Sequence, residues 1–239
     1  MLAIKSWILA TGSIALAAYT IFGGGLGISA AGENAVKLPA PTFDSPAVPQ
    51  ASRETAVFAG GCFWGVQGVF QHTNGVLNAV SGYSGGEKST ANYDTVSAGR
   101  SGHAEAVQIT YDPKLITYGK LLQIYFSVAH DPTTLNSQGP DHGTQYRSAV
   151  FYQNANQKLV TERCIVQLDA TKVFTKKIVT QLAPLAAFYP AEAYHQDYLA
   201  LNPSQPYIAT FDLPKIRNLQ VMMPEVYRDQ PVLMSQAGQ

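Results

Sequence analysis

The stretch from Thr55 to Phe70, TAVFAGGCFWGVQGVF, constrains the fold of this chain more than any other. Its first five residues are small, β-branched or aromatic and stop at a glycine pair, which is typical of a buried strand that ends in a tight turn. From Cys62 onward, Val66, Val69 and Phe70 recur at helical spacing, so we predict a helix that begins near the cysteine. A strand followed directly by a helix favours a fold built from a sheet and helices.

Cys62 stands at the predicted N-terminus of that helix. The free backbone N–H groups and the positive end of the helix dipole favour a thiolate there, so we predict a pKa below the value of about 8.5 for free cysteine. The next two residues, Phe63 and Trp64, offer an apolar wall for a substrate. These features favour a nucleophile. The alternative is a buried structural residue, because free cysteine is among the most buried residue types.

The amino terminus is typical of an export signal. Residues 6–32 carry no charge, and their apolar centre runs from Trp7 to Ala18. Small residues at 29–31 offer a cleavage site, but the apolar stretch is also long enough to remain as a membrane anchor. An apolar first helix of a cytosolic domain is the alternative, which the glycines at 23–25 disfavour. We therefore assign residues 1–32 to a signal peptide or N-terminal membrane anchor, and expect an exported protein in the periplasm or another extracytoplasmic compartment.

The remaining boundaries follow from proline content and periodicity. Four prolines between residues 39 and 49 predict an extended, unpacked linker over residues 33–53. The catalytic domain is predicted to start near Arg53, and the chain after Pro203 is rich in proline and short of periodicity, which predicts a tail. Sixteen basic and sixteen acidic residues balance without a charge run, so nothing favours a nucleic-acid partner.

Strands and helices alternate along the domain. Thr117 and Asn154 are predicted to cap helices, the second of which runs from residue 155 to about 174. Long polar loops are expected at 83–102 and 130–145. Further strands are predicted at 76–80, 103–111, 149–152 and 178–182, and a last helix at 191–201. This alternation predicts an α/β or α+β layer fold.

Glu105 is the main candidate for an acid. In a strand it shares a face with Val107, Ile109 and Tyr111 by the period of two. Burial in apolar surroundings raises the pKa of a carboxyl group, which a general acid at neutral pH requires. The alternative is a buried structural glutamate paired with a basic group.

Several separate motifs together resemble the A class of the peptide methionine sulfoxide reductases. The string GCFWG at 61–65 resembles the family's nucleophile motif, and Gly82-Tyr83 with Gly85-Gly86 resembles its glycine turn. Three further motifs follow in the family's order: GHAEAV at 102–107, DHGTQYRS at 141–148 and YPAEAYHQDY at 189–198. The resemblance covers roughly residues 54–219, which it implies are the catalytic domain, and leaves residues 220–239 as a C-terminal tail. It implies an α/β (α+β) two-layer sandwich around a mixed β-sheet, with a ferredoxin-like core.

The resemblance also implies a reaction. Cys62 attacks the sulfur of the S epimer of methionine sulfoxide, free or in proteins, and becomes a sulfenic acid. Glu105 gives a proton to the sulfoxide oxygen, and Tyr93 and Tyr146 donate hydrogen bonds to it. The residues expected to bind the rest of the substrate are Phe63, Trp64, Asp141 and His142. No metal or bound cofactor is expected, since the five histidines lack paired metal-ligand spacing.

The chain departs from the common pattern at its end. Many members carry resolving cysteines in the C-terminal tail, whereas residues 202–239 contain none. Cys164, the one other cysteine, falls in an apolar row with Val160 and Leu168 in a predicted helix, which favours a structural role. We therefore expect a one-cysteine cycle, in which an external thiol regenerates Cys62. The expected partners are proteins containing methionine sulfoxide and a thiol reductant, which is thioredoxin-like, glutaredoxin-like or a small thiol.

Two alternatives from other functional classes stay open. One is a cysteine hydrolase or acyltransferase, with Cys62 as nucleophile and His142 or His195 as base. The other is an exported binding module that uses Phe63, Trp64 and the tyrosines as an aromatic pocket for a thioether or methylated group.

Overall fold

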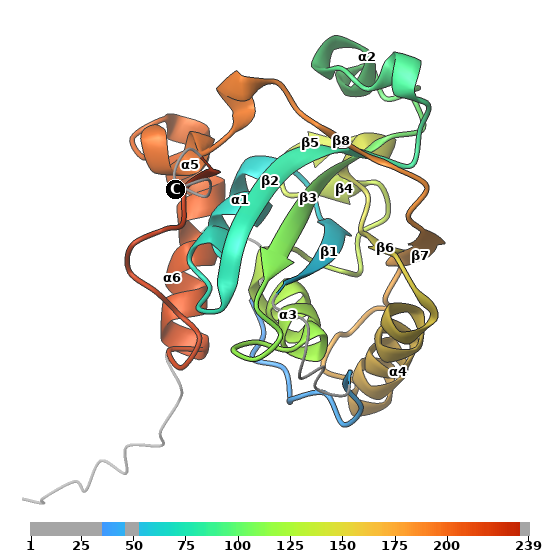
Figure 1. Cartoon of the computed structure of the whole chain (residues 1–239), viewed down its shortest axis with the longest axis vertical. Coiled ribbons are helices and arrows are strands. Elements are labelled where there is room, and N and C mark those ends of the chain that lie inside the picture. The colour runs from blue at the N-terminus through green and yellow to red at the C-terminus, as the bar shows by residue number, and fades with distance from the viewer. Residues whose placement is uncertain (1–34, 46–52, 235–239) are drawn as a thin grey trace, which may run out of the picture.

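A six-stranded sheet lies at the centre of the molecule (Figure 1). The structure is a computed structural model and describes residues 35–45 and 53–234. The strand order is β7-β6-β1-β3-β2-β8, and every neighbouring pair is antiparallel except β6 and β7, which are parallel. The strands are β1 (Glu54–Ala59), β2 (Val76–Ser84), β3 (Ala104–Tyr111), β6 (Ala149–Tyr152), β7 (Gln181–Pro184) and β8 (Phe188–Pro190). The mixed sheet that the family resemblance implies is confirmed.

Helices and a small hairpin complete the described structure. The hairpin is formed by β4 (Ser137–Gln138) and β5 (Asp141–His142). The α-helices are α1 (Phe63–Gln71), α2 (Tyr93–Ser97), α3 (Tyr118–Ile124), α4 (Ala155–Thr171), α5 (Tyr198–Leu201) and α6 (Leu213–Met222). Single π-helical turns lie at Tyr125–Ala129, which extends α3, and at Ile208–Asp212, which leads into α6; 3₁₀ turns lie at Lys88–Thr90, Thr144–Tyr146 and Ala193–His195.

The order β1-α1-β2-β3-α3-β6 gives the core a ferredoxin-like topology. β1 and β2 both run antiparallel to β3, which lies between them. They are therefore parallel to each other, and α1 is the crossover that joins them. This crossover places the N-terminus of α1, and with it Cys62, at the end of β1.

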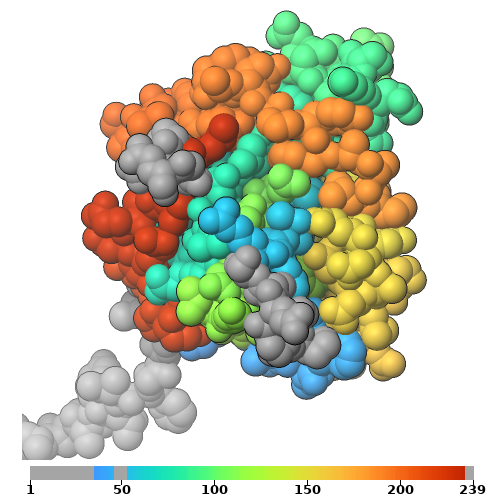
Figure 2. Space-filling view, viewed as in Figure 1, coloured from blue at the N-terminus to red at the C-terminus, as the bar shows by residue number. Residues whose placement is uncertain are grey.

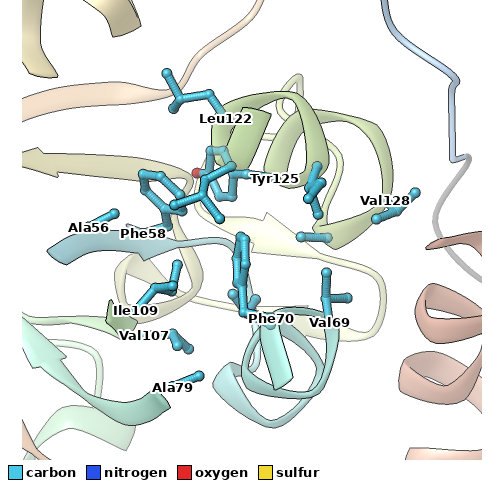
Figure 3. Close-up of a cluster of buried hydrophobic side chains, with 14 of the residues drawn as sticks. Ala56, Phe58, Val69, Phe70, Ala79, Val107, Ile109, Leu122, Tyr125 and Val128 are labelled. Carbon is cyan, nitrogen blue, oxygen red and sulfur yellow. The ribbon is translucent and has the colours of Figure 1, made fainter. Parts of the chain in front are cut away.

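The main hydrophobic core lies between the sheet and one layer of helices (Figure 3). Phe58 of β1, Phe70 of α1 and Tyr125 meet there, with Phe58 and Tyr125 ring centroids 4.9 Å apart. On the other face of the sheet the buried side chains of β1, β3 and β6 are mostly small, and the segment 183–188 covers them. The helices and the sheet thus form two layers, as the family resemblance implies.

Two helices begin at the predicted caps. The Thr117 hydroxyl accepts a hydrogen bond from the Lys120 N–H at 3.1 Å, and the Asn154 side chain accepts one from the Gln157 N–H at 2.9 Å. Cys164 of α4 is 4% exposed and belongs to the main core. Its predicted place in the core is confirmed.

The predicted helix at 191–201 is wrong. The segment contains only a 3₁₀ turn and the short α5, because Asp197 adopts a left-handed conformation with φ of 58°. The Asp197 carboxylate accepts hydrogen bonds from Gln71 Nε2 at 2.6 Å and from Met234 N at 2.9 Å. These long-range bonds fix a backbone conformation that interrupts the helix.

Other predicted elements are shifted or incomplete. The strand predicted at 178–182 is β7 and occupies Gln181–Pro184. α4 ends at Thr171 and not near 174, because Lys172 is left-handed with φ of 52°. The loops predicted at 83–102 and 130–145 contain α2 and the β4–β5 hairpin respectively.

The predicted unpacked linker is wrong over residues 35–45. This segment has no helix or strand, yet Leu38 is 2% exposed in the main core. Asp44 accepts hydrogen bonds from Thr117 Oγ1 at 2.5 Å and from Gly119 N at 2.8 Å, at the start of α3. In Figure 2 the blue atoms of the segment lie at the lower edge of the molecule, beneath the yellow atoms of the region of α4. The predicted signal or anchor at 1–32 lies outside the described residues. Among the described helices, none has the length and apolar character that crossing a membrane requires.

The folded part also extends further toward the C-terminus than predicted. Pro214 lies in the first turn of α6, where a proline is tolerated because the N–H it lacks has no partner in the helix. After α6 the chain returns to α1, since Arg228 N bonds to His72 O at 2.9 Å and Val232 N to Gln71 O at 3.0 Å. Residues 220–234 are thus packed on the domain.

Candidate active site

A tight turn between β1 and α1 presents Cys62. Gly61 has φ of 83°, and a Cβ at this position would lie 2.6 Å from Gln138 Cβ. Only glycine adopts this positive φ without strain and also leaves room for the Gln138 side chain. Cys62 follows as the N-cap of α1 with φ of −54° and ψ of 123°, as the sequence predicts.

Glu105 lies against this helix N-terminus. The Phe63 N–H donates a hydrogen bond to Glu105 Oε2 at 3.0 Å, and the side chain is buried. Burial raises the pKa of Glu105 to about 8, the nearby Asp141 and Asp212 raise it as well, and the Phe63 N–H lowers it. None of the ion pairs found within the described residues involves Glu105. The carboxyl group therefore holds a proton at neutral pH, which favours the acid over the structural ion pair.

The predicted low pKa of Cys62 is wrong. Burial raises the pKa of the thiol well above its ordinary value, and the carboxylates of Glu105 and Asp212 raise it further. The Trp64 N–H and the Lys215 ammonium lower it, but by less than the other effects. The helix N-terminus acts as predicted, yet it is outweighed by desolvation, by the Asp212 carboxylate and, once Glu105 ionises above a pH of about 8, by Glu105 as well. At rest the sulfur is a thiol.

Seven predicted residues meet in one pocket, which we call the aromatic pocket. It has about 480 Å³ of empty space, part of it open to solvent. Burial and the neighbouring carboxylates raise the pKa of the Tyr93 and Tyr146 hydroxyls, so both remain neutral hydrogen-bond donors. The lining residues are Cys62, Phe63, Trp64, Tyr93, Glu105, Asp141, Tyr146 and Tyr207.

His142 does not line the aromatic pocket, contrary to the prediction. It follows Asp141 in β5, is exposed, and has its Nδ1 3.1 Å from Ser137 Oγ. Successive side chains of a strand point to opposite faces, so Asp141 and His142 cannot both face the pocket. Asp141 accepts a short hydrogen bond from the Tyr207 hydroxyl, a pocket residue that sequence reasoning missed.

Glu192 and His195 hold the aromatic walls, and sequence reasoning assigned them no such role. Glu192 accepts hydrogen bonds from Tyr93 N at 2.9 Å and from the Tyr83 hydroxyl at 2.8 Å. Trp64 Nε1 donates to His195 Nδ1 at 3.2 Å. The indole also stacks on Tyr198, with centroids 4.0 Å apart and planes at 13°. The motif at 189–198 therefore supports the aromatic pocket from behind.

A buried ion pair lies behind Cys62 and was also missed. Asp212 is fully buried, and Lys215 Nζ lies 3.4 Å from its Oδ1. Burial raises the pKa of Asp212 to about 6, which the lysine partly counteracts. Asp212 packs directly on Gly65 of α1. Pro214 could have indicated a helix start here, but nothing in the sequence indicates that α6 begins against α1.

Within the described residues, no three histidine, cysteine, aspartate or glutamate side chains are grouped as a metal site would require. Both cysteines are free. Burial raises the pKa of Cys164 to about 12, so it is a poor nucleophile at neutral pH.

Comparison with known proteins agrees with this site. The family described as "Peptide methionine sulfoxide reductase" matches residues 54–225, well over half of the chain. Peptide methionine sulfoxide reductase MsrA 2 of Mesorhizobium japonicum is 58% identical over 196 residues, which cover 82% of this chain and 100% of that relative. The protein of the same name from Synechocystis is 48% identical over 185 residues, 77% of this chain and 86% of that relative.

Solved structures show the same similarity. Reduced Mxr1 of Saccharomyces cerevisiae matches with a TM-score of 0.62 and 35% identity, covering 67% of this chain and 92% of that one. Methionine sulfoxide reductase A of Corynebacterium diphtheriae matches with a TM-score of 0.56 and 33% identity, over 72% and 89% of the two chains. The chain therefore belongs to the peptide methionine sulfoxide reductase family, A class.

Proposed function

We propose that this enzyme reduces the S epimer of methionine sulfoxide, free or within proteins, with Cys62 as the nucleophile. The observation that carries the proposal is the pairing of a thiol with a buried, protonated carboxyl group in one aromatic pocket. Cys62 and Glu105 both line that pocket, and Glu105 keeps its proton up to a pH of about 8.

In the first step the sulfoxide oxygen lies among Glu105 and the hydroxyls of Tyr93 and Tyr146. Negative charge grows on this oxygen as its bond to sulfur weakens, and fixed donors stabilise that charge most. Glu105 donates its proton to the oxygen and receives the proton that Cys62 loses. The Cys62 sulfur gains the oxygen as a sulfenic acid, and methionine leaves, so that atoms and protons balance.

The apolar walls select the methyl side of the substrate. Trp64 is fixed by its hydrogen bond to His195 and by stacking on Tyr198. A fixed wall opposite the oxygen-binding hydroxyls allows one arrangement of methyl, oxygen and side chain around the sulfur. This supports discrimination between the two sulfoxide epimers.

The reduced enzyme is regenerated by an external thiol. The tail supplies no resolving cysteine, and Cys164 is buried in α4. A thioredoxin-like protein, a glutaredoxin-like protein and a small thiol all supply the required sulfur chemistry. The charge-free segment at 6–32 supports export, and fractionation of cells that express the full chain tests that location.

The two alternative functions lack support in the site. A cysteine hydrolase needs a histidine within hydrogen-bond reach of its nucleophile. His142 is exposed outside the pocket, and His195 Nδ1 accepts from Trp64 behind the pocket wall. A binding module would not need a protonated Glu105 beside a thiol.

Turnover of each sulfoxide epimer with dithiothreitol tests the proposal. We expect methionine from the S epimer only, complete loss with Cys62→Ser, and wild-type activity with the matched variant Cys164→Ser. A hydrolase would form an acyl-enzyme and no methionine. Undiminished ligand binding by Cys62→Ser, together with absent turnover in the wild type, would indicate a binding module.

A further inference from the structure

Cys62 borders a second pocket as well as the aromatic one. This smaller pocket is shallow and open to solvent, with about 240 Å³ of space that includes the solvent at its mouth, and it lies between the β4–β5 hairpin and the start of α6. It adds Gln138, Pro140, Phe211 and Lys215 to the surroundings of Cys62. We call it the lysine pocket.

The two pockets are divided by one hydrogen-bonded pair. Asp141 and Tyr207 line both pockets, and they are joined through the tyrosine hydroxyl. Cys62 is the third residue that both pockets share. Cys62 therefore borders both pockets, on either side of residues that they share.

The chemistry of regeneration needs a second approach to the Cys62 sulfur. The oxygen on the Cys62 sulfenic acid comes from a sulfoxide held by Glu105, Tyr93 and Tyr146, so its S–O bond points into the aromatic pocket. A thiolate that displaces this oxygen attacks the sulfur in line with the S–O bond, from the side away from the oxygen. The aromatic pocket is also where the product methionine leaves. The lysine pocket contains none of the three groups that hold the oxygen.

Lys215 brings an ammonium group to this second side, within an ion pair whose carboxylate, Asp212, acts on the pKa of Cys62 more strongly and in the opposite direction. It lines the lysine pocket, forms an ion pair with Asp212 and lowers the pKa of the Cys62 thiol. An ammonium group stabilises both an approaching thiolate and the Cys62 thiolate that is released at the end.

We propose that the lysine pocket is the entrance for the reducing thiol, which rests on the proposed function above. The incoming thiolate sulfur bonds to the Cys62 sulfur, the S–O bond breaks, and Glu105 gives its proton to the departing oxygen to form water. A second thiolate then attacks the mixed disulfide and releases Cys62 as a thiolate. Two thiols supply the two electrons and end as one disulfide.

The test separates the two half-reactions. The full chain is first oxidised with one equivalent of S-epimer sulfoxide, and methionine is counted. Then 2-mercaptoethanol or reduced thioredoxin is added, and loss of the sulfenic acid is followed by rapid quenching and mass. Pro140→Trp narrows the lysine pocket, while the turn is retained because Gly139, with φ of 52°, is unchanged. The matched control is Pro224→Trp, an exposed proline beyond the far end of α6.

We expect Pro140→Trp to lower the rate constant of sulfenic acid reduction tenfold or more, with methionine formation within twofold of wild type. Pro224→Trp should change neither half-reaction by more than twofold. If Pro140→Trp slows sulfenic acid reduction by mercaptoethanol, by thioredoxin or by both, the result supports the proposal. It also identifies which thiol enters through the lysine pocket. Reduction at the wild-type rate with both thiols, or equal slowing of both half-reactions, would overturn the proposal.

A second variant protects the test against misfolding. If Pro140→Trp loses methionine formation as well, Phe211→Trp is used instead, because it narrows the same pocket from the side of α6. Slower sulfenic acid reduction with normal methionine formation would support the proposal, and unchanged reduction or equal slowing of both half-reactions would overturn it. Failure of the wild type to form methionine at all would instead refute the proposed function, so the two failures are distinguishable.

Discussion

At the scale of single residues, the central feature is a carboxyl group that keeps its proton at neutral pH. Glu105 does so because it is buried beside two other carboxylates, and its one N–H donor does not offset that environment. Its neighbour Cys62 remains a thiol for the same reason. The two groups can therefore exchange protons during the reaction without taking one from water.

Replacing Glu105 by a residue that cannot donate a proton should slow the step in which the sulfoxide is reduced to methionine. We predict that Glu105→Gln slows methionine formation in a single turnover by about 10²–10⁴-fold, the typical contribution of a general acid. The wild-type rate should fall above a pH of about 8, where Glu105 ionises, and this fall should be absent from the variant. Rapid-quench measurements from pH 6 to pH 9.5 check both effects. Equal pH profiles for the two proteins would contradict this role.

The same group should make stability depend on pH. The folded pKa of Glu105 is raised to about 8, whereas an unfolded glutamate titrates near pH 4.3. Between these values the folded state binds more protons, so the free energy of unfolding falls as pH rises. We predict that wild type loses about 2–4 kcal/mol more than Glu105→Gln between pH 5 and pH 8.5. Urea unfolding at both pH values measures this difference. Equal losses of unfolding free energy in the two proteins would show that the pKa of Glu105 is not raised in the folded state.

At the scale of elements, the active site depends on how closely α6 approaches the first turn of α1. A Cβ at Gly65 would lie 2.1 Å from Asp212 Oδ1 and 2.7 Å from its Cγ. In the same helix, a Cβ at Gly68 would meet the end of the flexible Leu199 side chain at 2.8 Å. A side chain at position 65 would therefore displace a buried carboxylate, whereas one at position 68 would displace only the end of a flexible side chain.

We predict that Gly65→Ala destabilises the protein and Gly68→Ala does so much less. Alanine favours a helix over glycine by about 1 kcal/mol, but forcing a buried carboxylate to move costs about 1–3 kcal/mol. Gly65→Ala should also slow methionine formation, because Asp212 packs on the first turn of α1, of which Cys62 is the N-cap. Denaturant unfolding of the two variants tests the contrast. A Gly65→Ala protein as stable as Gly68→Ala would show that α6 is not packed so tightly.

The elements that the sequence predicts correctly are those with local signals. The strand before Gly60, the caps at Thr117 and Asn154 and the burial of Cys164 all follow from periodicity and capping. The strand containing Glu105 also appears where the period of two places it. Each of these signals lies within a few residues of the element that it specifies.

The failures have a common physical cause, which is long-range contact. Asp197 breaks a predicted helix because Gln71 and Met234 bind its carboxylate. The thiol pKa was predicted from the helix N-terminus alone, without the carboxylates that other elements bring to it. Tyr207, Asp212 and Lys215 lie beyond Pro203, in a region whose prolines suggested a tail.

At the scale of the whole molecule, the folded unit includes segments on both sides of the predicted domain. Residues 35–45 cover the start of α3 and the side of α4 through Leu38, Asp44 and the bond from Thr42 N to Gln167 Oε1 at 2.8 Å. Residues after α6 return to α1. Residues 35–45 and 220–234 are therefore part of the folded unit, on opposite sides of the predicted domain in the sequence.

We predict that Asp44→Ala lowers the free energy of unfolding by about 1–2 kcal/mol, because it removes two hydrogen bonds at the start of α3. Activity at moderate temperature should stay near wild type, since Asp44 lines neither pocket. Thermal unfolding with a parallel assay measures both. The exposed Asp229 offers a matched control, Asp229→Ala, and equal effects of the two substitutions would show that the 35–45 segment contributes nothing to stability.

The most direct test of the central claim is a single turnover without any thiol. The full chain is mixed with the S or the R epimer of methionine sulfoxide, methionine is counted, and the mass of the Cys62 peptide is measured. We predict about one methionine per enzyme from the S epimer, none from the R epimer, and one added oxygen on Cys62. No methionine from the S epimer, or added oxygen found on Cys164 and not on Cys62, would contradict the account.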